Sequence, residues 1–155
     1  FVGRLEPGYA APDLEPTPLY DEPMCVIARP EHPLAGRTRV RWADLAELPW
    51  VVPPSWASSR VKLNQMFYQQ GLNPPSDLIE SASFLVTLTF VREHSAIAFV
   101  ARSVARSLER QGQARALKIT VPIELPPVGI LTMRGRKRSP ACQQMIDALR
   151  KAARG

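Results

Sequence analysis

Short apolar runs alternate with amphipathic helical patterns along residues 50–110. The runs predict short strands at Trp50–Val52, Asp77–Glu80 and Ala96–Val100. The patterns predict helices that carry Leu63, Met66 and Phe67, then Leu85, Leu88 and Val91, then the segment Ser103–Arg110. Because strands alternate with helices, we expect an α/β fold with a mostly parallel or mixed sheet covered by helices.

Helix starts and stops are marked by serines and glycines. Ser55–Ser59, and Ser81 with Ser83, offer hydroxyls for N-caps. Gly71 is placed to follow the first helix in a left-handed conformation, with Leu72 beyond it, and Gly112 ends the third helix.

The segments on either side of this region carry weaker signals. Glu6–Pro18 is rich in proline and acid and predicts a loop or crossover, and Leu19–Ala28 ends in an apolar strand. Pro30 and Pro33 predict a rigid turn. Val40–Leu48 predicts one or two helical turns.

Towards the ends of the chain, further strands and one helix are predicted. The strands are expected within Phe1–Leu5, Ala116–Ile119 and Val128–Met133. A last helix is expected to begin at Ser139–Pro140, with Met145, Ile146 and Leu149 as its buried stripe. The chain lacks an initial methionine and begins within strand-like sequence, so we expect a fragment of a longer protein.

The chain is basic, with a net charge of +6 and a pI near 9.9, which suggests nucleic acid or small anions as partners. The charge is scattered, and its one run, Arg134–Arg138, is interpreted as a solvated turn rather than a phosphate-binding patch. The sequence shows neither a membrane-length apolar run nor a signal pattern. We therefore expect a cytoplasmic protein without a membrane partner.

No residue pattern supports catalysis. His32 and His94 lie in predicted turns, and Cys25 and Cys142 are far apart, so we interpret the histidines as structural and the cysteines as free thiols. Nucleophile-elbow, P-loop and dinucleotide-binding motifs are missing from the sequence. We therefore predict no catalytic residue, no metal site and no cofactor.

The features with functional meaning are two helix starts that follow strands, at Pro54–Arg60 and Ser81–Phe84. Helix starts at the carboxyl ends of strands offer free N–H groups and a positive dipole end, which suit a small carboxylate or polyhydroxylated ligand. The periodicity alone favours the simpler alternative, in which these serines only cap the helices. Trp56 could line a pocket or belong to the core.

An ordered series of short motifs resembles LysR-type transcriptional regulators over nearly the whole chain. The motifs are Ala28–Ala35, Trp42–Ala46, Leu48–Pro54, Ser59–Arg60, Phe67, Gly71–Pro75, Ile79–Ser81, Ala98–Ala105, Pro127–Ile130 and Arg138–Ala141. The resemblance is strongest to regulators of sugar uptake and aromatic-acid catabolism. Two positions depart from the family pattern: His94–Ser95 replaces a glycine-containing turn, and Ala101–Arg102 replaces a proline.

The resemblance implies a periplasmic-binding-protein-like (type II) effector domain whose second lobe is complete and whose first lobe is only partial. Residues 1–18 would be a remnant of the first lobe with a crossover. Residues 19–125 would form the second, effector-binding lobe, and residues 126–155 would return a strand and a helix to the first lobe.

The resemblance also implies a function. A small-molecule effector, an aromatic acid or a sugar-like compound, would bind between the lobes of a homo-oligomer, and DNA would be bound only through an N-terminal winged helix-turn-helix. The implied ligand-binding residues are Pro54, Ser55, Ser58, Arg60, Ser81, Ser83, Phe84, Arg4 and Gly129. The fragment would hold half of this site. The alternative is a solute-binding protein of a transporter; a small α/β enzyme would need a catalytic cluster that the sequence lacks.

Overall fold

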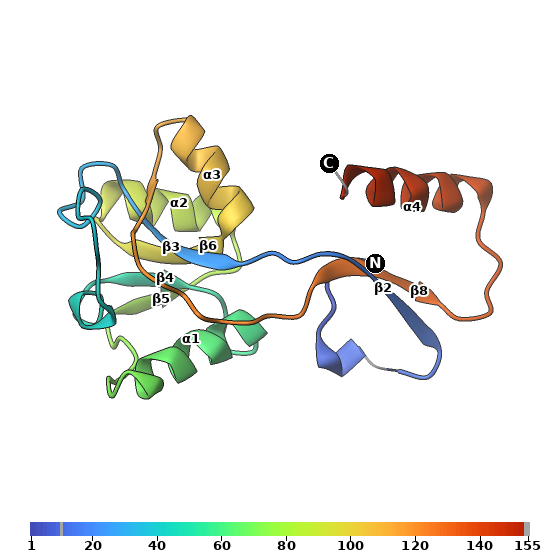
Figure 1. Cartoon of the computed structure of the whole chain (residues 1–155), viewed down its shortest axis with the longest axis horizontal. Helices are drawn as coiled ribbons and strands as arrows, with labels where there is room; N and C mark the ends of the chain where they lie inside the picture. The colour runs from blue at the N-terminus through green and yellow to red at the C-terminus, as the bar shows by residue number, and fades with distance from the viewer. Residues whose placement is uncertain (10, 154–155) are drawn as a thin grey trace. The chain divides into compact units, whose positions relative to one another are not determined.

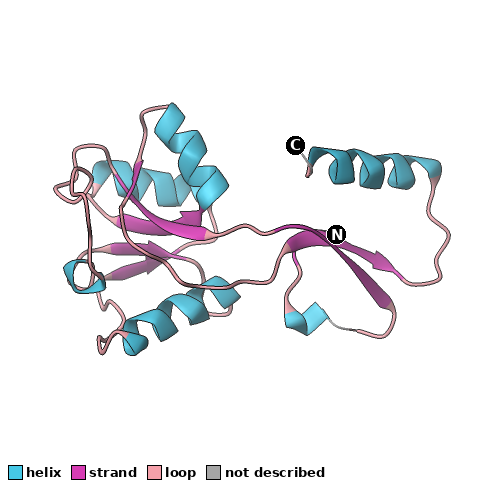
Figure 2. Ribbon diagram, viewed as in Figure 1, coloured by secondary structure: helices cyan, strands magenta, loops and turns pink. Residues whose placement is uncertain are grey.

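The computed structural model describes residues 1–9 and 11–153 and divides into two compact units. The first unit joins Phe1–Glu22 with Leu125–Gly155, and the second unit is Pro23–Glu124. Figure 1 traces the chain through both units, and Figure 2 shows that each contains strands and at least one helix.

The second unit is built on a five-stranded mixed sheet in the order β5-β4-β6-β3-β7. Its strands are β3 (Met24–Ala28), β4 (Trp50–Val52), β5 (Leu78–Glu80), β6 (Ile97–Ala101) and β7 (Arg115–Ala116). β4, β5 and β6 are parallel, whereas β3 runs antiparallel to β6 and β7. The three strands predicted between residues 50 and 101 are therefore present, each within one residue of its expected start.

Helices cover both faces of this sheet. α1 (Ser58–Gln69) lies on one face, and α2 (Phe84–Glu93) and α3 (Arg102–Arg110) lie on the other (Figure 1). A short 3-10 turn, η2 (Trp42–Asp44), precedes β4. The layered α/β arrangement predicted from the alternation of strands and helices is confirmed.

Alternating strand residues supply the two halves of the core, as the period of two in a strand requires. Ile27, Val51 and Ala98 cluster with residues of α2 and α3. On the opposite face Phe67 of α1 is fully buried and meets two tryptophans edge to face. Its ring centroid lies 5.2 Å from that of Trp42 and 5.8 Å from that of Trp50.

Two glycines end helices as predicted. After α1, Gly71 has φ +70° and donates its N–H to Tyr68 O, while Leu72 donates to Phe67 O. Gly112 has φ +67° and donates to Glu109 O after α3. The first pair of bonds forms a Schellman motif, which satisfies carbonyls that the helix would otherwise leave unpaired.

The first unit contains a three-stranded antiparallel sheet in the order β1-β8-β2. The strands are β1 (Val2–Arg4), β2 (Leu14–Tyr20) and β8 (Val128–Met133), with a 3-10 turn η1 (Pro7–Tyr9) between the first two. α4 (Pro140–Ala152) follows. Its start is as predicted: Ser139 is the N-cap and its hydroxyl accepts the Cys142 N–H at 3.2 Å.

Glu6–Pro18 was predicted as a loop or crossover. The loop alternative was wrong, because most of β2 lies in this segment, and the crossover stays a prediction. Prolines made this segment resemble a loop. Pro16 and Pro18 are two residues apart, so the positions that lack an N–H face the same side of the strand. β2 can therefore pair with β8 along its other side, and it lies at one edge of the three-stranded sheet.

The one or two helical turns predicted within Val40–Leu48 are present as the 3-10 turn η2. Three other local predictions need correction. Ala116–Ile119 contributes only one residue to the two-residue strand β7. The N-cap of α1 is Ala57, without a side-chain hydrogen bond, so the Ser55–Ser59 hydroxyls do not cap this helix. Met145 is 61% exposed, which leaves Ile146 as the one fully buried member of the predicted stripe in α4.

Ser95 replaces the expected glycine in a strained turn and has φ +55°. An L-residue with a Cβ is disfavoured in this region. We expect Ser95→Gly to raise the free energy of unfolding by about 1 kcal/mol in urea denaturation. Ser95→Ala keeps the Cβ and is the control, with little change expected. A Gly variant no more stable than the Ala variant would contradict the strain.

Candidate functional site

The carboxyl ends of three parallel strands meet at one edge of the sheet in the second unit. β5, β4 and β6 are consecutive neighbours and parallel, and each leads into a helix. We call the residues that follow these strands the carboxyl edge: Pro53–Arg60, Ser81–Phe84 and Ala101–Ser103. The first N–H groups of a helix lack intrahelical acceptors and lie at the positive end of its dipole, so such an edge favours a small anion or polar ligand.

A buried arginine holds the start of α1 against the end of β5. The Glu80 carboxylate accepts the Ser55 N–H at 3.2 Å and lies 3.6 Å from Arg60 Nη1. Arg60 is only 8% exposed, and its Nε donates to Asn64 Oδ1 at 3.0 Å. In this structure Arg60 therefore supports the loop at Pro54 and Ser55, whose backbone carries the exposed part of the edge.

Two serines shape the start of α2. Ser83 is the N-cap, and its hydroxyl accepts the Val86 N–H at 3.4 Å, which confirms the capping role. The Ser81 hydroxyl accepts the Ser83 N–H at 3.0 Å, and the Ser81 N–H donates to Val52 O at the end of β4. The two side chains thus fix the backbone between β5 and α2, and the Ser81 N–H ties it to the end of β4.

Large apolar side chains are exposed beside these helix starts. Trp56 is 81% exposed, so it does not belong to the core. Phe84 and Leu85, the first two residues of α2, are 50% and 71% exposed. The carboxyl edge thus brings the positive ends of helix dipoles together with exposed aromatic surface, which suits a ligand that has a polar or anionic group on an apolar body.

Arg102 was missed by sequence reasoning. It is the first residue of α3, directly after β6, and it is exposed at the carboxyl edge. Its N–H donates to Pro23 O at 2.8 Å, a bond that a proline at this position could not form. One feature of the sequence points to this position, because Ala101–Arg102 stands where the family pattern has a proline. That departure alone does not indicate a contact with ligand.

The structure brings seven predicted residues together in the second unit and places the other two in the first. The seven are Pro54, Ser55, Ser58, Arg60, Ser81, Ser83 and Phe84. In the first unit Arg4 uses Nη1 and Nη2 to donate to Pro126 O and Glu22 O, at 2.6 and 3.1 Å. Gly129 is buried in β8, opposite Gly3 and Pro18.

The structure gives one histidine a role in the scaffold. His32 is buried, and its Nδ1 accepts the Leu34 N–H at 3.2 Å. His94 is exposed beside Phe90. Cys25 is buried and Cys142 is exposed, and neither forms a disulfide in the described part of the chain. Within residues 1–9 and 11–153, no group of His, Cys, Asp and Glu side chains could hold a metal ion, and no helix is long and apolar enough to cross a bilayer.

His32 makes stability depend on pH. Burial, reinforced by the nearby Arg29 guanidinium, lowers the pKa of His32 from its usual value of 6.5. The unfolded chain therefore binds a proton more readily than the folded one, so this contribution to stability is complete above about pH 6.5 and is lost as the pH falls below it. We expect the free energy of unfolding, measured in urea from about pH 7 to pH 5, to decrease less in His32→Gln than in the unchanged protein.

His94→Gln removes the other histidine and is the matched control, which should keep the His32-dependent decrease. Identical pH profiles for His32→Gln and the unchanged protein would contradict a buried neutral imidazole.

Comparisons with known proteins place this chain in a family. Residues 1–154 match the family model described as the LysR substrate binding domain. The HTH-type transcriptional regulator GbpR of Azospirillum brasilense is 28% identical over 153 residues, which are 98% of this chain and 45% of GbpR. The chain spans between 37% and 49% of three curated relatives that it matches over nearly its whole length.

Solved structures share the fold. The regulatory domain of CcmR from Synechocystis PCC6803, in complex with 2-PG, has a TM-score of 0.74 and 21% identity, covering 97% of this chain and 71% of that one. The effector-binding domain of QuiR in complex with shikimate has a TM-score of 0.72 and 17% identity, covering 94% and 68%. These likenesses confirm the periplasmic-binding-protein-like fold, and the match to the family model shows that the chain belongs to the LysR substrate-binding domain family.

Proposed function

We propose that this chain is the effector-contacting part of a LysR-type transcriptional regulator and that the carboxyl edge of its second unit is the effector-binding surface. The observation that carries the proposal is the convergence of three helix starts at the ends of β4, β5 and β6. The family match supports it, because the matched relatives are transcriptional regulators.

We propose that the two units correspond to the lobes of the effector domain. The second unit, Pro23–Glu124, would be the complete second lobe, close to the expected range of 19–125. Residues 1–18 and 126–155 would be part of the first lobe. The chain spans less than half of the relatives' length, which supports a longer protein that supplies the rest of the first lobe. Arg4 and Gly129, which lie in the first unit, stay proposed effector contacts.

The proposed effector is a small organic acid or hydroxylated acid with an apolar portion. Backbone N–H groups at the helix starts would bind its carboxylate, with Ser55 and Ser58 nearby, while Trp56 and Phe84 would contact its apolar part. Related domains support this class, since CcmR was solved with 2-PG and QuiR with shikimate. Arg102 would supply the positive charge at the edge.

The whole protein would act as a cytoplasmic homo-oligomer that binds DNA through a separate N-terminal domain and has no enzymatic activity. Its relatives are named as HTH-type regulators, which favours this role over the solute-binding protein of a transporter. Effector binding would change the geometry of the lobes, and the oligomer would pass that change to the DNA-binding domains.

The charge of Arg102 provides a direct test. Isothermal titration of the full-length regulator with a panel of small organic acids, including 2-PG and shikimate, would identify a ligand. We expect Arg102→Ala to weaken its binding about tenfold, because a hydrogen bond between an arginine and a carboxylate contributes about 1.5 kcal/mol. Arg106→Ala removes an exposed charge one turn further along α3 and is the control. Equal affinity of the Arg102→Ala and Arg106→Ala variants would contradict the role of Arg102.

A further inference from the structure

A second concave site lies in the second unit, away from the carboxyl edge. A cavity of about 270 Å³, open to solvent, is lined by the segment 39–42, Gln70, the segment 118–120 and Pro122. Gln70 follows the last residue of α1, whereas the carboxyl edge lies at the start of that helix. Twelve residues of α-helix separate the two by about 18 Å. This cavity therefore does not belong to the proposed effector site.

The cavity has a rigid apolar floor. Val40 and Trp42 are buried, and the Trp42 indole Nε1–H donates to Thr120 O at 3.2 Å. The Val40 N–H donates to Lys118 O at 3.0 Å. These two bonds join segments almost eighty residues apart in the chain, and both Arg39 and Lys118 line the cavity.

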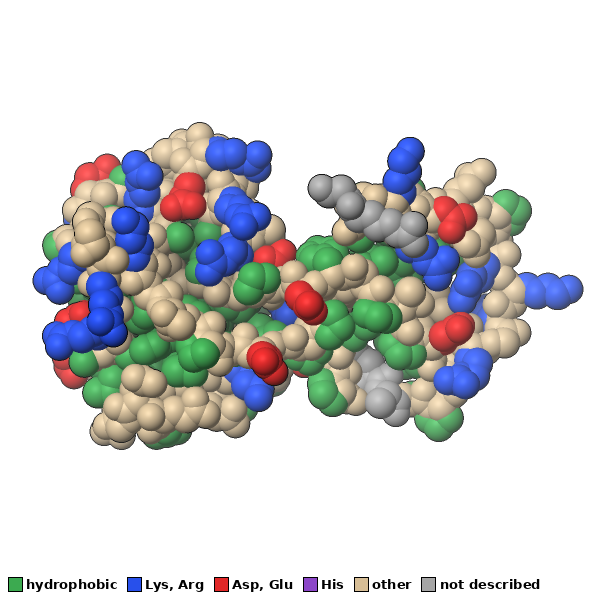
Figure 3. Space-filling model, in the orientation of Figure 1, with side chains coloured by type: hydrophobic (Ala, Val, Ile, Leu, Met, Phe, Trp, Pro, Cys, Tyr) green, Lys and Arg blue, Asp and Glu red, His purple; other side chains and the backbone are tan. Residues whose placement is uncertain are grey.

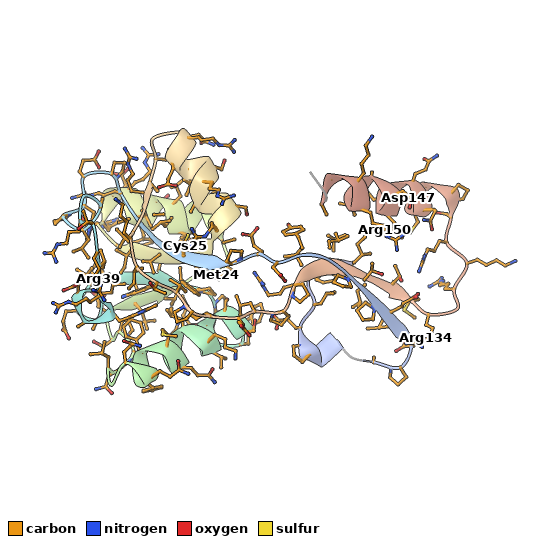
Figure 4. The ribbon with its side chains drawn as sticks, viewed as in Figure 1. Met24, Cys25, Arg39, Arg134, Asp147 and Arg150 are labelled. Carbon is orange, nitrogen blue, oxygen red and sulfur yellow. The ribbon has the colours of Figure 1, made fainter. Side chains whose placement is uncertain are left out.

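Positive charge around the cavity follows from the sequence Arg37-Thr38-Arg39-Val40-Arg41. Arg37, Arg39 and Arg41 are exposed, whereas Val40 between the last two is buried. Figure 4 labels Arg39 within the second unit, and Lys and Arg side chains gather over this end of the unit in Figure 3.

Two of the cations that line the cavity, Arg39 and Lys118, have no partner of opposite charge among the described residues. Asp44 pairs with Arg41 at 3.1 Å and with Arg37 at 3.9 Å. Within the described part of the chain, the side chains of Arg39 and Lys118 form neither an ion pair nor a hydrogen bond.

The cavity is lined by cations without any carboxylate. A second cavity of this unit, by contrast, sets Arg29 and Arg92 beside Glu31 and Glu93. At the nearby end of α1, the N–H groups of Gln70, Gly71 and Leu72 donate to the carbonyls of Met66, Phe67 and Tyr68, which leaves fewer unpaired carbonyls beside the cavity.

We propose that this cavity is a second ligand site, separate from the effector site, which binds an organic phosphate monoester with a flat apolar body. The phosphate would lie between the guanidinium of Arg39 and the ammonium of Lys118, and the apolar body would lie against the floor that contains Trp42. Two unpaired cations match the charge of a phosphate monoester, which is close to −2 near neutral pH. Arginine and lysine are the side chains that recognise phosphate most often.

Phenyl phosphate is the probe, and the Trp42 indole N–H is the reporter. In a titration of the 155-residue chain at about pH 7.5, followed by ¹H–¹⁵N correlation spectra, we expect saturable shifts of the Trp42 indole and of the amides of residues 39–41 and 118–120. Inorganic phosphate lacks the apolar body and benzyl alcohol lacks the charge, so each should bind at least about threefold more weakly than phenyl phosphate.

Matched double variants separate this site from general charge effects. We expect Arg39→Ala with Lys118→Ala to weaken phenyl phosphate binding about tenfold. Lys62→Ala with Arg106→Ala removes the same charge from exposed positions outside the cavity and should leave the affinity unchanged. The proposal is overturned if the first double variant binds as tightly as the unchanged chain, if both lose affinity equally, or if the shifts centre on Trp56 instead of Trp42.

Discussion

Phe67→Ala is expected to lower the free energy of unfolding of the second unit by about 3–5 kcal/mol. Phe67 is fully buried, and its ring meets Trp42 and Trp50 edge to face with centroids 5.2 and 5.8 Å away. Removing the ring deletes two aromatic contacts and leaves a cavity between α1, η2 and β4. Urea denaturation followed by tryptophan fluorescence measures the loss, since both indoles adjoin the site.

Tyr68→Ala is the matched control for this experiment. Tyr68 is the next residue of α1 and is exposed, so its truncation should change the free energy of unfolding by no more than about 0.5 kcal/mol. A loss below about 1 kcal/mol for Phe67→Ala, or similar losses for both variants, would mean that α1 does not pack on the sheet through this ring.

Gly129→Ala is expected to destabilise the sheet of the first unit by about 2–3 kcal/mol. Gly129 lies in β8, the central strand, and a Cβ there would collide with the backbone oxygen of Thr17 in β2 and with the Leu5 side chain. Backbone cannot move aside as a flexible side chain can. We expect faster hydrogen exchange of the β1, β2 and β8 amides, measured by mass spectrometry.

Gly3→Ala is the control, because Gly3 is the residue paired with Gly129 in β1 but its added Cβ would meet only the Phe1 side chain. We expect Gly3→Ala to destabilise the sheet less, and to speed hydrogen exchange less, than Gly129→Ala. Equal exchange rates in the two variants would refute the idea that close backbone approach requires glycine at position 129. Gly129 is also a predicted ligand contact. The close packing gives this position a separate, structural reason to be glycine.

Sequence reasoning predicted the elements that have strong local signals. The end of α1 at Gly71 and the start of α4 at Ser139 each depend on hydrogen bonds between neighbouring residues, so the local sequence specifies them. Strand β2 could not be predicted in the same way. Its prolines favour a loop locally, and only pairing with β8, more than a hundred residues later, makes it a strand.

In the candidate site, too, local features could be predicted from the sequence, whereas contacts between distant residues could not. The serine-rich helix starts were visible in the sequence, and the structure places them together because β4 and β5 are parallel neighbours. The burial of Arg60 against Glu80 and the position of Arg102 at the end of β6 depend on tertiary packing. The N-cap of α1 is Ala57 and not a serine, because the helix begins at Ser58 and Ser55 lies two residues before the cap position.

The central claim is that the carboxyl edge of the second unit contacts the effector. The most direct measurement is a ¹H–¹⁵N correlation spectrum of the effector domain, recorded with and without a ligand identified by calorimetry. We expect the largest amide shifts at residues 53–58, 81–84 and 101–103, together with the Trp56 indole. Shifts confined to other parts of the second unit, with these amides unchanged at saturation, would contradict the claim.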